Sequence, residues 1–160
     1  MQNAFESQLP KSKLTISLNK LVLLVFLLMV MYFGFDRYKQ HQTEQAETTV
    51  LVLNPQISDI YFLDMRLIKG DLERKNKYKL AKVVRVTDDN VAIVYGRFFY
   101  QWQYSVVNSI QYGDLSNDDY FTPIPEYIPL NKIREMENNG AIYLIKRPVR
   151  NQLYGNFVRP

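Results

Sequence analysis

A run of fifteen residues without a charge, residues 21–35, constrains this chain more than any other feature. A membrane-spanning helix needs roughly 20 apolar residues. The run approaches that length through Leu14, Ile16 and Leu18, because Lys20 is long enough to extend its ammonium group to the lipid headgroups. Aromatic side chains, which prefer the membrane interface, follow at the far end: Tyr32, Phe33, Phe35 and Tyr38. A cleaved signal peptide is the alternative, but the residues after the run are bulky where a peptidase requires small ones. The sequence therefore predicts a transmembrane anchor over residues 14–35.

The lysines and arginines beside this anchor predict its orientation. Lys11, Lys13 and Lys20 precede the apolar run 21–35, whereas Arg37 and Lys39 follow it together with acidic residues. Because basic residues favour the cytoplasmic side, residues 1–13 are expected to form a cytoplasmic tail. A short amino-terminal anchor is typical of the bacterial inner membrane, so we expect a single-pass protein of that membrane with a periplasmic carboxyl-terminal domain. In that place the net charge of +4 favours anionic lipid, cell-wall polymer or acidic protein over nucleic acid as a partner.

The remaining chain predicts one small β-rich domain. Residues 36–48 read equally well as a polar helical stalk and as a flexible linker. Within the domain, residues 49–148, strands are predicted over 50–53, 58–68, 77–86, 91–95, 97–112 and 141–146. A helix is expected over 129–138 with Gly140 as its cap, and three prolines argue against regular pairing in 113–129. The basic tail, 149–160, is either an added strand or ordered only by a partner. The expected fold is mainly β, an SH3-like barrel or sandwich with one short α-helix.

Several kinds of chemistry are disfavoured by composition. The chain has no cysteine, and its one histidine, His41, falls in the predicted stalk. Residues 114–119 carry oxygens at calcium-loop spacing, but Asp119 replaces the glycine of the turn and Pro125 replaces the bidentate glutamate. We therefore expect no metal, no cofactor and no catalytic residues.

Aromatic residues predict a binding surface. Phe98, Tyr100, Trp102 and Tyr104 alternate along the predicted strand 97–112. They either fill the core or form an edge offered to a partner by strand addition, and stacking against sugar rings is a third interpretation. Tyr127 and Ile128, in the proline-containing loop, either pack beneath the domain or mark a docking surface. All six residues form the predicted protein-binding set.

A basic stretch predicts a second surface. Arg74, Lys75, Lys77 and Lys79 are expected to face an anionic surface, either lipid headgroups or an acidic subunit. A solvated strand face is the alternative interpretation of the same residues.

Together these features predict a non-enzymatic structural or adaptor subunit of an envelope-spanning assembly of the secretion, conjugation, pilus or motor type. Its expected partners are other membrane or periplasmic proteins and the lipid bilayer through residues 14–35; a homo-oligomer is compatible with this. One alternative is a membrane-anchored inhibitor or immunity protein. A third is an envelope-polymer enzyme that uses Asp118, Asp119 and Glu126.

Overall fold

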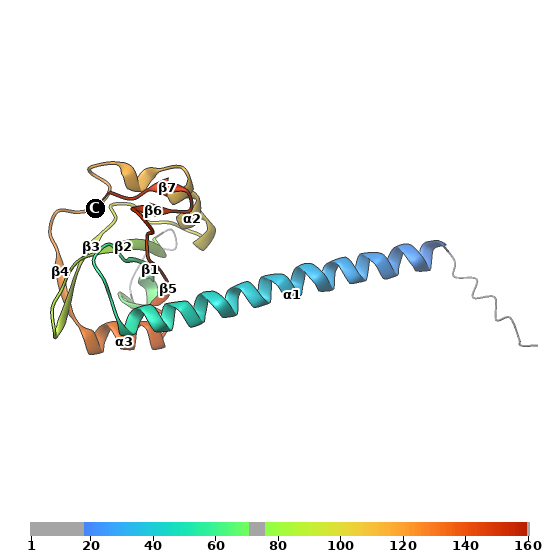
Figure 1. The fold of residues 1–160 in the computed structure, drawn as a ribbon, viewed down its shortest axis with the longest axis horizontal. Coiled ribbons are helices and arrows are strands. Elements are labelled where there is room, and N and C mark those ends of the chain that lie inside the picture. Colours follow the sequence, from blue (N-terminus) through green and yellow to red (C-terminus); the bar gives the residue numbers. More distant parts are fainter. Residues whose placement is uncertain (1–17, 71–75, 160) are drawn as a thin grey trace, which may run out of the picture. The chain divides into compact units, whose positions relative to one another are not determined.

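The computed structural model describes residues 18–70 and 76–159. The chain forms two compact units, Met1–Gln40 and His41–Pro160. Helix α1 (Leu18–Leu53) supplies the described part of the first unit, and its last turns belong to the second (Figure 1). By length and composition it is the one helix among the described residues that is able to cross a membrane, a test that a signal sequence also passes. Residues 18–35 rise roughly 27 Å as a helix, close to the thickness of a bilayer core.

Five antiparallel strands form the sheet of the second unit, in the order β4-β3-β2-β1-β5. They are β1 (Ile60–Asp64), β2 (Tyr78–Val86), β3 (Asn90–Tyr95), β4 (Glu126–Pro129) and β5 (Ile142–Lys146). The predicted hairpin over 77–95 is confirmed as β2 and β3, with the Thr87 N–H donating to the Asn90 carbonyl at 2.9 Å. The outer strands β4 and β5 each pair with one neighbour among the described residues. The mainly antiparallel β character is therefore supported, whereas closure into a barrel is not confirmed.

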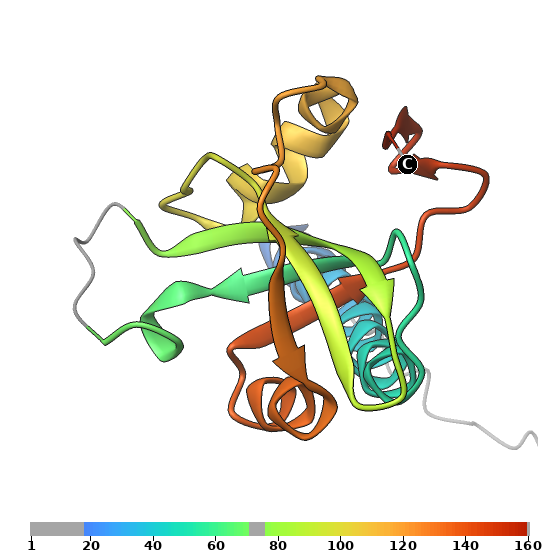
Figure 2. The ribbon, with the colours of Figure 1, turned by 90° about the vertical axis from the view of Figure 1, so that its left-hand side faces the viewer.

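The two faces of the sheet each pack against a separate hydrophobic cluster. Figure 2 shows α3 (Leu130–Asn138) and α2 (Gln103–Gln111) on opposite sides of the strands. Tyr61 and Leu63 of β1 belong to the cluster with α3, whereas Ile60 and Phe62 belong to the cluster with α2. The sequence places Tyr61 and Leu63 on one face and Asp64 and Arg66 on the other, which predicts one exposed face for the strand over 58–68. This prediction is wrong for β1. Every β1 position is buried because helices cover both faces of the strand.

Two predicted strands are helical. Residues 50–53 form the last turn of α1, and Val52 is buried in the hydrophobic cluster between the sheet and α3. Residues 97–112 were expected to form one long strand, but they contain a short loop followed by α2. Val106 and Ile110, four residues apart, place one helical face of α2 in the core. This helical periodicity determines the structure of the segment in place of the aromatic alternation that precedes it.

The carboxyl-terminal part follows the prediction more closely. The expected helix over 129–138 is confirmed as α3, and Gly140 adopts the positive φ of 80° that suits a residue after a helix. The expected last strand is β5. Strand β4 was missed, since its Pro129 is tolerated at the edge of a sheet. Short 3₁₀ turns, η1 (Met65–Leu67) and η2 (Asp114–Ser116), complete the domain together with β6 (Gln152–Leu153) and β7 (Asn156–Phe157). The β6–β7 hairpin buries Leu153 within the α2-side cluster.

Candidate functional site

The predicted aromatic set is divided by the structure. Phe98, Trp102 and Tyr104 are 56 %, 50 % and 63 % exposed, on the loop before α2 and in its first turn. Tyr100 instead is partly buried and packs against the hydrophobic cluster on the α2 side of the sheet. Its backbone pairs with that of Tyr78, and its hydroxyl lies 2.8 Å from the Tyr120 hydroxyl. The exposed members therefore do not share a strand face with Tyr100.

The other two predicted protein-binding residues lie on β4, the far outer strand of the sheet. Tyr127 is half exposed, whereas Ile128 is 6 % exposed and packs in the cluster with α3. Burial leaves the Ile128 side chain without a surface to offer a partner. The six residues predicted as one binding set therefore do not form one surface.

Lysine ammonium groups lie over the exposed rings. The Lys77 Nζ is 5.3 Å from the centroid of the Trp102 ring, and the Lys79 Nζ is 4.3 Å from that of Phe99. Partial burial, and secondarily the charge of Lys69, lowers the pKa of Lys79. We call this set the aromatic–lysine surface: Lys77, Lys79, Phe98, Phe99, Trp102 and Tyr104. Arg74 and Lys75, the other two predicted anion-facing residues, lie outside the described residues.

The acidic residues of the loop before β4 form surface ion pairs. Asp119 lies 3.4 Å from Arg97, and Asp118 pairs with Arg159, with both carboxylates largely exposed. Exposed pairs of this kind contribute little free energy. Within residues 18–70 and 76–159, no group of three or more His, Asp or Glu side chains is arranged to hold a metal ion.

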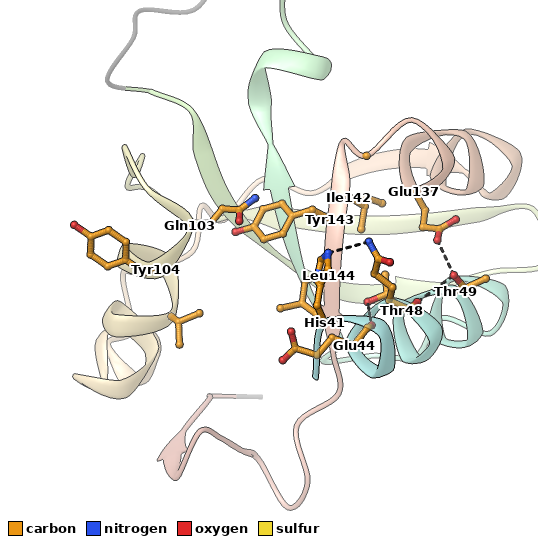
Figure 3. A pocket seen from close by; sticks show the side chains of 13 residues that line it. His41, Glu44, Thr48, Thr49, Gln103, Tyr104, Glu137, Ile142, Tyr143 and Leu144 are labelled. Carbon is orange, nitrogen blue, oxygen red and sulfur yellow. Dashed lines mark hydrogen bonds between the residues drawn. The ribbon is translucent and has the colours of Figure 1, made fainter. Parts of the chain in front are cut away.

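A groove of about 450 Å³ lies between the last turns of α1, strand β5 and the start of α2. Figure 3 shows His41, Glu44 and Thr48 of α1 near Tyr143 and Leu144 of β5. Gln103 and Tyr104 of α2 complete it on the other side. The groove is mixed in character, because carboxylates, amides and an imidazole border it together with apolar side chains. It has the size of many ligand-binding clefts in proteins.

Hydrogen bonds from α1 position this groove beside the open edge of β5. The Thr48 Oγ1 accepts the Ile145 N–H at 3.1 Å and donates to the Glu44 carbonyl at 2.8 Å. The Ile145 N–H thus points away from β1, toward the side where a further strand would pair. The Thr49 Oγ1 donates to the Glu137 Oε1 at 2.8 Å, which links α1 to α3. These contacts anchor α1 at one end of the β5 edge.

An unpaired polar atom lies at the groove. The Tyr143 hydroxyl is buried and has no hydrogen-bond partner among the described residues, although Tyr143 borders the groove. Its ring packs edge-on against Phe62 and Tyr78, with centroids 6.0 Å and 5.7 Å away. Burial raises the pKa of Tyr143 well above its ordinary value, so the phenol is a neutral donor at physiological pH. Buried polar atoms normally have partners, so this hydroxyl, like that of Tyr61, is an exception among the described residues.

Sequence reasoning missed the groove. Residues 36–48 have no apolar stripe, which favoured a stalk or linker outside the domain. The only feature of the sequence that points to the groove is the spacing of Thr48 and Val52, which lie four residues apart and so share one face of a helix. In the structure both are buried. Without the position of β5, this pair does not predict a contact.

The fold and the groove define a class of architecture: an antiparallel sheet with helices on both faces, preceded in the chain by a helix long and apolar enough to cross a membrane. No protein-family model, curated protein or solved structure matches this chain.

Proposed function

We propose that this chain is a non-enzymatic, single-pass membrane protein of the bacterial inner membrane that acts as a structural or adaptor subunit of an envelope-spanning assembly. Helix α1 would span the membrane, with the sheet domain on the periplasmic side. The domain would bind a segment of a neighbouring envelope protein. Secretion, conjugation, pilus and motor complexes are the assemblies in which such a subunit is expected.

The groove at the β5 edge is the observation that carries this proposal. An outer strand is a ready template for an added strand where its edge is uncovered. On β5 this is the part before Ile145, because the Ile145 N–H is already bonded to Thr48. The β5 edge borders a groove of about 450 Å³, which Ile142, Tyr143 and Leu144 of this strand line. Glu137 gives the groove an acidic group, whereas Glu44 lies 3.6 Å from the Lys146 Nζ. We therefore expect the bound segment to be extended and to carry a basic side chain that faces Glu137.

Membrane anchoring makes weak docking sufficient. Two proteins held in one membrane meet at a high effective concentration, so a modest groove maintains a stable complex. The surface ion pairs of Asp118 and Asp119 support a binding role over hydrolysis of envelope polymer, because a carboxylate pair for hydrolysis faces across a cleft.

The test is purification of the tagged full-length protein in mild detergent, followed by sizing and mass spectrometry. We expect several membrane proteins at fixed ratio with the wild type. Gln45→Arg should release them, because Gln45 borders the groove and a longer cationic side chain there would occupy it next to Glu44. Asn138→Arg is the matched control, since it adds the same charge at an exposed position of α3.

Other results have defined meanings. One soluble partner bound one-to-one would favour the inhibitor or immunity protein. A monomer that co-purifies with nothing would contradict the adaptor function. Equal complexes from both variants would exclude the groove as the docking site.

A further inference from the structure

We propose that the aromatic–lysine surface lies in the headgroup layer of the membrane that α1 crosses, with anionic lipid as its partner. This inference requires a membrane-inserted α1 but does not depend on the adaptor function. It assigns Phe98 and Trp102 to lipid rather than to a protein, whereas Tyr104 borders both this surface and the groove.

The first support is the exposure and chemistry of this surface. Three large aromatic side chains, Phe98, Trp102 and Tyr104, are each at least half exposed within seven residues of chain. Clustered apolar exposure of this kind marks an interaction site. Tryptophan and tyrosine are the residues that prefer the membrane interface, and lysines beside them gain from the negative potential of anionic lipid. The Lys77 ammonium group lies over the Trp102 ring and that of Lys79 over the neighbouring Phe99 ring. One contact with anionic lipid would therefore involve both the aromatic rings and the lysines.

The second support is where the surface lies within its unit. The first residue of the second unit, His41, borders the same groove as Gln103 and Tyr104. The start of α2 is therefore near the point where the chain enters the domain. Trp102 and Tyr104 of the aromatic–lysine surface lie at this start, and the Lys77 ammonium group lies over the Trp102 ring.

Chain length supplies the third support. His41 follows Phe35, the last residue of the apolar run, by six positions. Six residues span about 9 Å as a helix and at most roughly 20 Å when extended. The headgroup layer on each side of the hydrocarbon core is roughly 5–8 Å thick. The side of the domain next to His41 is thus tethered within reach of the headgroups by the length of the chain alone.

Trp102 makes the inference directly testable, because it is the one tryptophan in the sequence. The full-length protein would be placed in nanodiscs of phosphatidylcholine with or without phosphatidylglycerol. We expect Trp102 emission to shift to shorter wavelength in the anionic nanodiscs relative to the zwitterionic ones. We also expect loss of most quenching by aqueous acrylamide. Lipids brominated near the headgroup should quench Trp102 more strongly than lipids brominated near the chain end.

Matched charge variants test the role of the lysines. Lys77→Gln with Lys79→Gln should abolish the difference between anionic and zwitterionic nanodiscs. Lys132→Gln with Arg134→Gln removes the same charge from exposed positions of α3 and should leave the difference intact.

The wild-type quenching measurement needs no variant to fold. Full acrylamide access together with no quenching by either brominated lipid would overturn the inference. Trp102 that is exposed in nanodiscs but protected in native membranes would also overturn it, by identifying a protein as the partner. If Trp102 is embedded in the nanodisc lipid but the protein co-purifies with no partner, the lipid contact is supported and the adaptor function is contradicted. Failure of the lipid contact can therefore be distinguished from failure of the adaptor function.

Discussion

Replacing Thr48 with valine tests whether the last turns of α1 are bound to β5. Thr48 is 3 % exposed, and its Oγ1 accepts the N–H of Ile145, which is fully buried. Valine keeps the volume and branching of threonine but removes the oxygen, so the buried N–H loses its partner. An unsatisfied buried group costs about 1–3 kcal/mol, and we expect Thr48→Val to lower the free energy of unfolding by that amount.

The assay is urea unfolding of the full-length protein in detergent micelles, followed by Trp102 fluorescence. With a slope of about 1–3 kcal/mol/M, the midpoint should fall by about 1 M urea without a change in slope. Thr49→Val is the matched control. Thr49 is exposed and its hydroxyl bonds to the Glu137 carboxylate, so its loss should cost no more than about 1 kcal/mol. Equal stabilities for Thr48→Val and the wild type would refute the docking of α1 on β5.

Three further perturbations test the core. Arg147→Met removes the guanidinium that donates to both oxygens of the fully buried Asp59 at 2.7 and 2.8 Å; urea unfolding should show a loss of about 3–5 kcal/mol, and a loss below about 1 kcal/mol would contradict this. Gly96→Ala places a Cβ 2.9 Å from the Tyr120 ring and should cost about 1–3 kcal/mol, whereas Gly70→Ala, with open space around it, should stay within about 0.5 kcal/mol of wild type. Burial raises the pKa of the Tyr120 phenol above 10.0. The buried neutral phenol therefore contributes fully to the stability of the folded state below about pH 10, and this contribution is lost as the pH rises further. Urea unfolding should show a lower free energy of unfolding at about pH 11 than at about pH 9, and equal values would contradict the prediction.

Local sequence signals predicted the elements that depend on near neighbours. The apolar run of residues 21–35 is helical within α1, because its composition suits one structure over its whole length. The β2–β3 hairpin followed from two apolar arms around Thr87 and Asn90. Helix α3 followed from the spacing of Ile133 and Met136 and from Gly140 beyond it. In each case the residues that determine the element lie close together in the sequence.

Local patterns failed where a distant element determines the structure. The aromatic alternation from Phe98 to Tyr104 resembles a strand, yet only Tyr100 pairs with a strand, through Tyr78. The apolar residues 50–53 predict a strand, whereas Val52 ends a helix and joins a cluster whose other members, such as Ile133, are far from it in sequence. Strand β1 was expected to expose one face, since nothing near it in the chain shows that α1, α2 and α3 cover both.

By itself, the sequence determined an apolar helix able to span a membrane and a mainly antiparallel β domain after it. Both properties arise from composition and short-range periodicity, which do not depend on the rest of the chain. Tertiary structure alone decided that Thr48 meets Ile145, that a groove opens beside β5, and that Lys77 lies over Trp102. These contacts join residues far apart in the chain. They arise only when burial of both faces of β1 brings α1, α2 and the sheet together.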